Sequence, residues 1–170
     1  MSERIRESGH ESWKKEVVLM KKKDLLILSL LRRNCRLSLT DISRATKVPV
    51  STVYDKLKLF RGGIIRKHSA IIDFSKLGYI VKAHIILSVD RLQKDEFSSY
   101  MQNQASVNSF YRINNGYDFL AEVLCRDISE FEQFMDRLGG KFKIKDKKAF
   151  FIIDELKKEA FLADEGVLDV

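Results

Sequence analysis

Hydrophobic residues in the first third of the chain recur at the three- and four-residue spacing of amphipathic helices. The first such segment is mainly apolar over residues 25–31. Asp24 precedes it, and Arg32 and Arg33 follow it, so an acid and two cations lie at the helix ends whose partial charges they complement. We therefore expect a first, largely buried helix.

A second, shorter helix is predicted to begin at Ser38. Asp41 follows three residues later, which is the spacing of a capping box. The helix must end near Lys47, because Pro49 disfavours helical geometry in the residue before it.

A third helix is predicted over about residues 50–60, with Gly62-Gly63 ending it through a positive φ. Residues 64–72 alternate well enough to predict a strand or hairpin with a basic centre. The predicted core face of the third helix consists of Val50, Val53, Tyr54, Leu57 and Phe60.

The second half of the chain has the patterns of strands and helices in alternation. Asn115-Gly116 is a strong hairpin signal, and Gly139-Gly140 is expected to end the last helix. The lysine-rich segment 141–148 is expected to be a solvated loop and strand edge. The predicted elements are a strand at 80–89, a helix at 94–104, strands at 107–113 and 117–125, a helix at 128–138 and a strand at 149–156. This βαββαβ order is that of a ferredoxin-like domain, so the chain is predicted to be α+β.

Composition and charge separate the two halves. The 170 residues are 45% hydrophobic and 32% charged, which excludes a disordered chain. Residues 21–70 carry 13 basic and three acidic side chains, whereas residues 71–170 carry 14 and 17. Such a basic module favours a polyanionic partner, most commonly nucleic acid. No signal peptide, membrane span, disulfide framework or metal-ligand spacing is visible, and we expect a cytoplasmic protein without cofactor or metal.

Three helices, a tight turn and a following strand predict a winged helix-turn-helix that binds double-stranded DNA through its third helix. A solvated helix face would have the same polar pattern, and Asp55 could simply pair with a neighbouring lysine. The predicted base contacts are Ser51, Thr52, Asp55 and Lys56, and the predicted phosphate contacts are Lys58, Arg61, Arg66 and Lys67.

These residues resemble the leucine-responsive/asparagine-regulator (Lrp/AsnC) family of transcription factors. The resemblance rests on D-x-x-I-L-x-x-L at 24–31, Arg36-Leu37-Ser38, Asp41-Ile42-Ser43, Ile72-Asp73 and Leu77-Gly78-Tyr79. The chain departs from the family pattern at Lys67-His68, where Gly-Tyr is usual, and at Lys47, where the turn often has Gly.

The resemblance implies a C-terminal domain whose sheets pair into homodimers or higher even-numbered oligomers, which bind roughly palindromic sites. It also implies an effector, typically an amino acid, near the turn that usually has the sequence G-[DE]-[YF]-D. The corresponding residues are Asn115, Gly116, Tyr117 and Asp118. Whether this turn binds a ligand of altered specificity or the domain only assembles stays open.

The expected organisation is a variable extension at 1–20, a winged helix-turn-helix domain at 21–73 with its motif at about 39–58, a linker at 74–79, a ferredoxin-like domain at 80–160 and an acidic tail at 161–170. An enzyme that resembles siroheme decarboxylases on the same layout is the alternative. Only three histidines are available, His10, His68 and His84, and no catalytic motif occurs, so we expect no enzyme and no catalytic residues.

Overall fold

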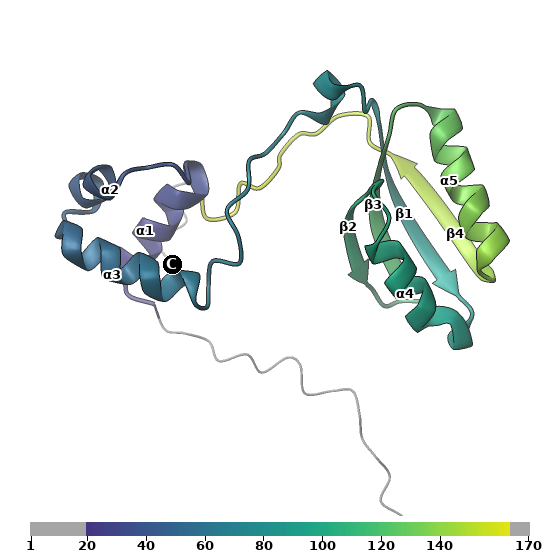
Figure 1. The fold of residues 1–170 in the computed structure, drawn as a ribbon, viewed down its shortest axis with the longest axis horizontal. Coiled ribbons are helices and arrows are strands. Elements are labelled where there is room, and N and C mark those ends of the chain that lie inside the picture. The colour runs from purple at the N-terminus through teal and green to yellow at the C-terminus, as the bar shows by residue number, and fades with distance from the viewer. Residues whose placement is uncertain (1–19, 164–170) are drawn as a thin grey trace, which may run out of the picture. The chain divides into compact units, whose positions relative to one another are not determined.

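The computed structural model describes residues 20–163, which divide into two compact units (Figure 1). The first unit combines residues 20–69 with residues 157–163, and the second comprises residues 70–156. Each unit is built around its own hydrophobic core. The predicted N-terminal extension, except for its last residue, and most of the predicted acidic tail lie outside the described residues.

The first unit contains the three predicted helices, α1 (Lys22–Arg33), α2 (Leu39–Thr46) and α3 (Val50–Arg61). The predicted capping box begins α2, since the backbone N–H of Asp41 donates to Ser38 Oγ at 3.1 Å and Ser38 Oγ donates to Asp41 Oδ2 at 2.6 Å. The core contains Ile27 of α1, Ile42 of α2, and Val53 and Phe60 of α3, and it holds the three helices together.

Two predicted backbone features of the first unit are wrong. Gly62 ends α3 with a φ of −78°, so the helix terminates without the positive φ that we expected from this glycine. Residues 64–72 form no strand, although a strand was predicted there. A strand needs a partner for its backbone hydrogen bonds. The backbone N–H groups of Ile64 and Ile65 instead bond back to Phe60 O at the end of α3.

Residues 157–163 return to the first unit. The Arg32 guanidinium donates to the Glu159 carboxylate and backbone oxygens, both at 2.9 Å, and to the Phe161 carbonyl at 3.2 Å. Leu162 packs against the core cluster of the three helices. The first unit is therefore assembled from two separate stretches of chain.

The second unit is a four-stranded antiparallel sheet with the order β2-β3-β1-β4. This order and the two helices confirm the predicted ferredoxin-like βαββαβ domain. Its elements are the 3₁₀ turns η1 (Phe74–Leu77) and η2 (Arg91–Gln93), the strands β1 (Val81–Val89), β2 (Val107–Arg112), β3 (Phe119–Cys125) and β4 (Ile144–Phe151), and the helices α4 (Lys94–Gln102) and α5 (Ile128–Lys141).

Both helices pack on one face of the sheet. Alternate residues of β1, such as Ile85 and Leu87, are fully buried in one cluster with Phe97 of α4 and Phe134 of α5. The neighbouring residues of β1 point to the opposite face, which no helix of this unit covers. Five aromatic residues of this unit lie in the core, whereas three others that we expected there are exposed. The buried ones are Phe97, Phe119, Phe131, Phe134 and Phe142, and the exposed ones are Tyr111, Phe150 and Phe151.

The end of the second unit differs from prediction. Helix α5 continues through Gly139 and Gly140, because the buried Leu138 and Phe142 anchor the chain on both sides of them. The Phe142 N–H donates to Leu138 O at 2.9 Å. Strand β4 begins five residues before the strand predicted at 149–156, and it occupies much of the lysine-rich segment that we expected to be a solvated loop and strand edge. It is an edge strand of the sheet, where charged side chains are tolerated, and this masks its pattern in the sequence.

Candidate nucleic-acid interface

One ridge of α3 carries most of the predicted base contacts. Val53 and Phe60 are buried and fix the rotation of the helix against the core. At 3.6 residues per turn, the side chains on the opposite ridge are Ser51, Asp55 and Lys58, with Thr52 beside them, and all four are exposed. Asp55 forms no ion pair with any residue of the described chain, so the alternative in which it simply pairs with a neighbouring lysine is not seen.

Lys56 is placed differently from the other predicted base contacts. Its Nζ lies 2.9 Å from Asp24 Oδ2, and both side chains are largely buried. The contact joins the middle of α3 to the first turn of α1. The Lys56 ammonium is therefore engaged within the unit and does not lie on the exposed ridge.

The turn between α2 and α3 sets the orientation of the exposed ridge of α3. Lys47 has a φ of 52° and a ψ of 40°, which is left-handed backbone geometry. The Ser43 hydroxyl donates to Val48 O at 2.6 Å and closes the turn. Lys47 occupies the position at which the family often has glycine, and its geometry explains that preference.

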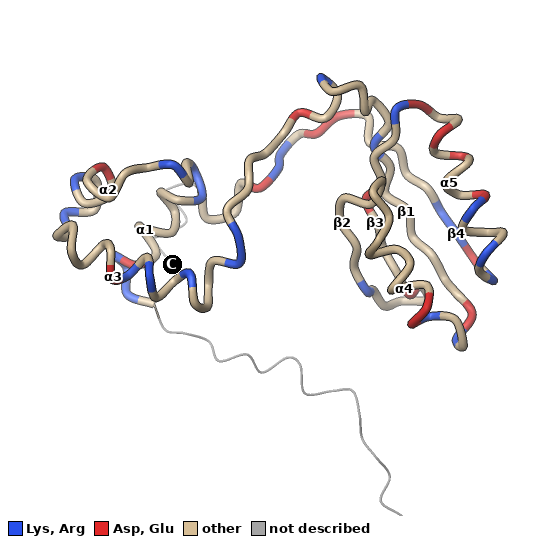
Figure 2. The backbone as a smooth tube through the Cα atoms, viewed as in Figure 1, with Lys and Arg blue, Asp and Glu red and all other residues tan. Residues whose placement is uncertain are grey.

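The predicted phosphate contacts gather at the end of α3 and in the segment after it. Arg61, Arg66 and Lys67 are exposed, and Figure 2 shows basic residues along this part of the first unit. None of these three side chains forms a hydrogen bond or ion pair within residues 20–163. Cations without acidic partners are available to an external anion such as a phosphate.

Two residues that were predicted to lie on the core face of α3, Val50 and Tyr54, are exposed. Tyr54 has a relative exposure of 57%, although its helical spacing predicted a core position. It lies one residue from the buried Val53, so it borders the core without entering it. Spacing alone cannot distinguish such a flanking position from a buried one.

The predicted effector turn lies between β2 and β3 of the second unit. Asn115 and Gly116 have φ values of 65° and 90°, as expected for a tight hairpin turn with two left-handed residues. The Tyr117 hydroxyl donates to Asp146 Oδ2 of β4 at 2.7 Å, and the Lys148 ammonium lies 5.4 Å from the centre of the Tyr117 ring.

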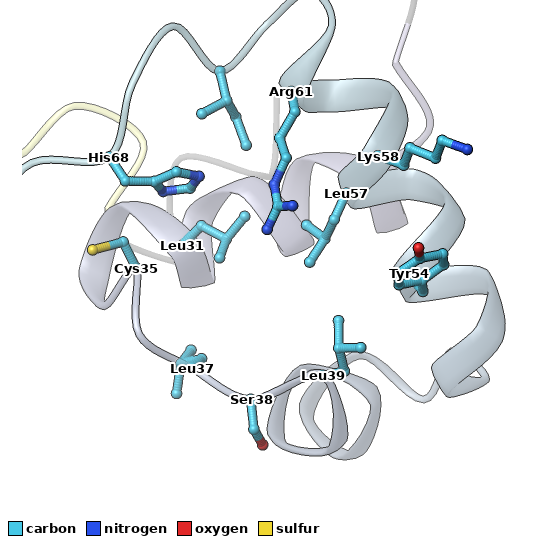
Figure 3. A pocket seen from close by; sticks show the side chains of 11 residues that line it. Leu31, Cys35, Leu37, Ser38, Leu39, Tyr54, Leu57, Lys58, Arg61 and His68 are labelled. Carbon is cyan, nitrogen blue, oxygen red and sulfur yellow. The ribbon is translucent and has the colours of Figure 1, made fainter.

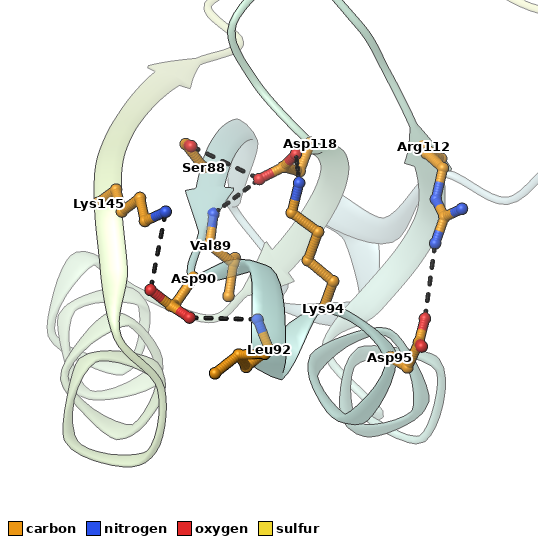
Figure 4. A network of polar contacts seen from close by, with 9 residues as sticks. All are labelled: Ser88, Val89, Asp90, Leu92, Lys94, Asp95, Arg112, Asp118 and Lys145. Atoms are coloured by element: carbon orange, nitrogen blue, oxygen red, sulfur yellow. Dashed lines mark hydrogen bonds and ion pairs between the residues drawn. The ribbon is translucent and has the colours of Figure 1, made fainter.

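Asp118 is already engaged within its own domain. Its carboxylate accepts from the Val89 N–H at 2.9 Å, from the Ser88 hydroxyl at 3.5 Å and from the Lys94 ammonium (Figure 4). Burial raises the pKa of this carboxyl group, but the bonds from Lys94, Val89 and Ser88 outweigh burial and hold the pKa below its ordinary value. Asp118 therefore remains charged and joins the predicted effector turn to the end of β1.

The described residues contain neither a candidate metal site nor a cluster of histidines. No group of three or more His, Cys, Asp or Glu side chains within residues 20–163 could hold a metal ion. His68 and His84 belong to different units, and His10 lies outside the described residues. No helix in the described part of the chain is both long and apolar enough to cross a membrane.

Two family models match the sequence. Residues 20–60 match a winged helix-turn-helix DNA-binding domain, and residues 82–161 match a domain described as the Lrp/AsnC ligand binding domain. These ranges correspond closely to α1–α3 and to the sheet with its two helices.

Relatives are regulators from several organisms. An uncharacterized HTH-type transcriptional regulator of Pyrococcus abyssi is 32% identical over 113 residues, which cover 66% of this chain and 72% of that protein. The HTH-type transcriptional regulator FL11 of Pyrococcus horikoshii is 28% identical over 118 residues, or 69% of this chain and 78% of the relative. The glutamate uptake regulatory protein of Zymomonas mobilis is 23% identical over 143 residues, or 82% and 87%.

Solved structures share the fold. A transcriptional regulator of Neisseria meningitidis in complex with L-Met superposes with a TM-score of 0.77 at 23% identity, covering 82% of this chain and 93% of that one. AsnC of E. coli superposes with a TM-score of 0.74 at 17% identity, covering 82% and 96%.

Proposed function

Because the chain belongs to the Lrp/AsnC family of transcriptional regulators, we propose that it binds roughly palindromic DNA sites as a homodimer or higher even-numbered oligomer. The winged helix-turn-helix makes it a DNA-binding regulator, and the comparisons give the enzyme alternative no support. Its relatives regulate transcription, which argues against an enzyme. A protein that acts on DNA in this way is proposed to work in the cytoplasm.

The exposed ridge of α3 is the observation that carries this proposal. Ser51, Thr52 and Asp55 project from the first half of the helix, where side chains of a helix-turn-helix reach base edges. We propose that Thr52 and Ser51 donate or accept hydrogen bonds at base edges and that Asp55 accepts from a cytosine amino group. Lys56 is proposed to hold α3 against α1 through Asp24, in place of its predicted base contact.

The remaining cations are proposed to contact the DNA backbone. Lys58, Arg61, Arg66 and Lys67 are exposed and follow the proposed base contacts along the chain. Each phosphate that they neutralise releases condensed counterions, so affinity is expected to depend steeply on salt concentration.

The uncovered face of the sheet supports homodimer formation. Ile86 of β1 pairs with Leu120 of β3, and Tyr111 of β2 also pairs with Leu120, so these apolar side chains share that face. Phe150 of β4 pairs with His84 on the same face, and Phe150 and Tyr111 are more than half exposed. A second copy of this face would remove these side chains from water.

A small-molecule effector, for example an amino acid, is proposed to bind at the turn formed by Asn115, Gly116, Tyr117 and Asp118. The relative from Neisseria meningitidis that was crystallised with L-Met supports an amino acid. Because Lys94 already pairs with Asp118, an amino-acid ammonium would have to compete for this carboxylate. Backbone groups of the turn and the Tyr117 hydroxyl are therefore proposed as the main contacts.

Selection of bound duplexes from a random pool at one physiological salt concentration tests this function. We expect enrichment of a pseudo-palindrome whose half-sites lie about one helical turn, or 10 base pairs, apart or a multiple of it. Thr52→Ala, with the exposed Thr40→Ala as matched control, should alter preference within the half-site. A pool without any enriched sequence would contradict the proposal.

A further inference from the structure

The first unit contains a half-open pocket of about 440 Å³ whose lining includes two of the proposed phosphate contacts, Lys58 and Arg61 (Figure 3). Its walls come from the end of α1, the loop before α2, α3 and the segment after α3. This volume lies within the range of small-molecule sites. Most of the lining is apolar, from Leu31, Leu37, Leu39, Tyr54, Leu57 and Ile65.

The charged side chains that line the pocket, Lys58 and Arg61, are both basic. Lys58, Arg61 and His68 line the pocket, and no Asp or Glu does. None of the three side chains forms a hydrogen bond or an ion pair with another residue in the described part of the chain. In Figure 3 the Arg61 guanidinium points into the pocket between Leu31 and Leu57, the His68 ring turns toward it from the opposite wall, and Lys58 points away to the rim.

An apolar pocket with one guanidinium pointing into it and an imidazole beside it favours a particular class of ligand. The exposed part of Tyr54 and the leucines around it favour a hydrocarbon or aromatic body, because burying it removes apolar surface from water. The Arg61 guanidinium favours a carboxylate, to which it can donate two parallel hydrogen bonds.

We propose that this pocket binds an amphipathic carboxylate, with its apolar body among Leu31, Leu57 and Tyr54 and its carboxylate at Arg61 and His68. The expected effect of this ligand on DNA binding rests on the proposed function. Arg61 is a proposed phosphate contact, and a guanidinium engaged by a bound carboxylate is withdrawn from DNA. The ligand therefore lowers DNA affinity from within the DNA-binding unit itself, separately from the effector turn in the second unit.

Binding is tested on the full chain with octanoate, and the histidine ring resonances report it by NMR. The chain has only three histidines, so His68 can be assigned through His68→Gln, and His84 in the other unit serves as an internal control. Saturable movement of the His68 signal by octanoate, with His84 unmoved, supports the site. Acetate lacks the apolar body and 1-octanol lacks the charge, so both should bind at least about tenfold more weakly.

Matched variants test the proposed contacts. Arg61→Gln and His68→Gln should each weaken octanoate binding about tenfold, measured by calorimetry, because each removes a hydrogen bond to a charged group. Arg44→Gln, an exposed cation of α2 outside the pocket, should leave the affinity for octanoate unchanged. Equal binding of 1-octanol and octanoate, or an unmoved His68 signal, would overturn the proposal.

The DNA arm separates this inference from the proposed function. Octanoate should weaken DNA binding of the natural chain. His68 lies outside the proposed DNA contacts, so His68→Gln should need about tenfold more octanoate for the same loss of DNA binding. A chain that binds DNA but leaves the His68 signal unmoved by octanoate rejects the pocket alone. A chain that binds octanoate but no duplex rejects the proposed function and leaves the pocket in place.

Discussion

Lys56 Nζ and Asp24 Oδ2 lie 2.9 Å apart and link the middle of α3 to the first turn of α1. Because both side chains are largely buried, removal of either one leaves the other charge poorly solvated. We expect Lys56→Ala to lower the free energy of unfolding by about 1–3 kcal/mol, measured by urea denaturation. The double variant Asp24→Asn/Lys56→Met should lose less than the two single losses combined. An unchanged stability with altered preference at one base pair would instead make Lys56 a base contact.

Thr52→Ala should reduce discrimination at particular base pairs by about 1–3 kcal/mol, because a hydrogen bond at a base edge depends on the base. The measurement is competition between the selected site and its single-base variants at constant salt. Equal weakening on all these duplexes would remove Thr52 from the residues that contact bases.

Arg66→Ala and Lys67→Ala should weaken binding to every duplex alike and reduce the salt dependence. Each lost phosphate contact lowers the slope of log affinity against log salt by about one. Titrations at several salt concentrations measure this slope, with Lys76→Ala of η1 as the control. The segment after α3 does not contact DNA if the slopes of both variants equal that of the natural chain.

Lys47→Gly should stabilise the first unit, because a left-handed residue with a Cβ carries a steric cost that glycine avoids. The greater freedom of glycine in the unfolded chain offsets part of the gain, so about 0.5–1 kcal/mol should remain. Arg44→Gly, within α2, should instead destabilise by about 1 kcal/mol. The midpoint of thermal unfolding measures both effects, and a loss of stability in Lys47→Gly would contradict the explanation.

Asp118→Asn should make the second unit less stable at neutral pH and less sensitive to acid. The lowered pKa means that the folded state favours the charged carboxylate more than the unfolded state does. This contribution is complete above the unfolded pKa of about 4 and disappears as the pH falls through the folded pKa. We expect a loss of about 1–3 kcal/mol at pH 7 that shrinks toward pH 2, measured by urea unfolding.

The exposed Asp95, whose carboxylate lies 3.8 Å from the Arg112 guanidinium, provides the control for this prediction. Asp95→Asn should leave stability nearly unchanged at neutral pH, because exposed ion pairs contribute little. If the two variants have the same pH profile, the network around Asp118 does not stabilise the fold.

The sequence predicted correctly those features that depend only on residues close together in the chain. The capping box at Ser38, the stop before Pro49 and the left-handed turn at Asn115 all form as expected. Gly139 and Gly140 misled the prediction, because the burial of Phe142 beyond them depends on the assembled sheet. The strand in the lysine-rich segment was missed for the same reason, since its pairing with β1 is a long-range contact.

The same distinction between local and long-range interactions applies to the candidate sites. Exposure of Ser51, Thr52 and Asp55 followed from helical spacing, which is a local property. The engagement of Lys56 by Asp24 and of Asp118 by Lys94 joins residues 32 and 24 positions apart in the sequence. Charge and spacing could nominate these residues, but their partners depend on how distant elements pack.

The return of residues 157–163 makes the first unit discontinuous in the chain. Its helices leave the ribosome early, whereas Leu162, which packs on their core, is synthesised only after all of the second unit. Co-translational folding of the helical unit therefore finishes last, and a fragment that ends at residue 73 would have Arg32 without its Glu159 and Phe161 contacts. Isolated domains of this protein should accordingly be expressed with the final segment supplied by fusion through a short linker.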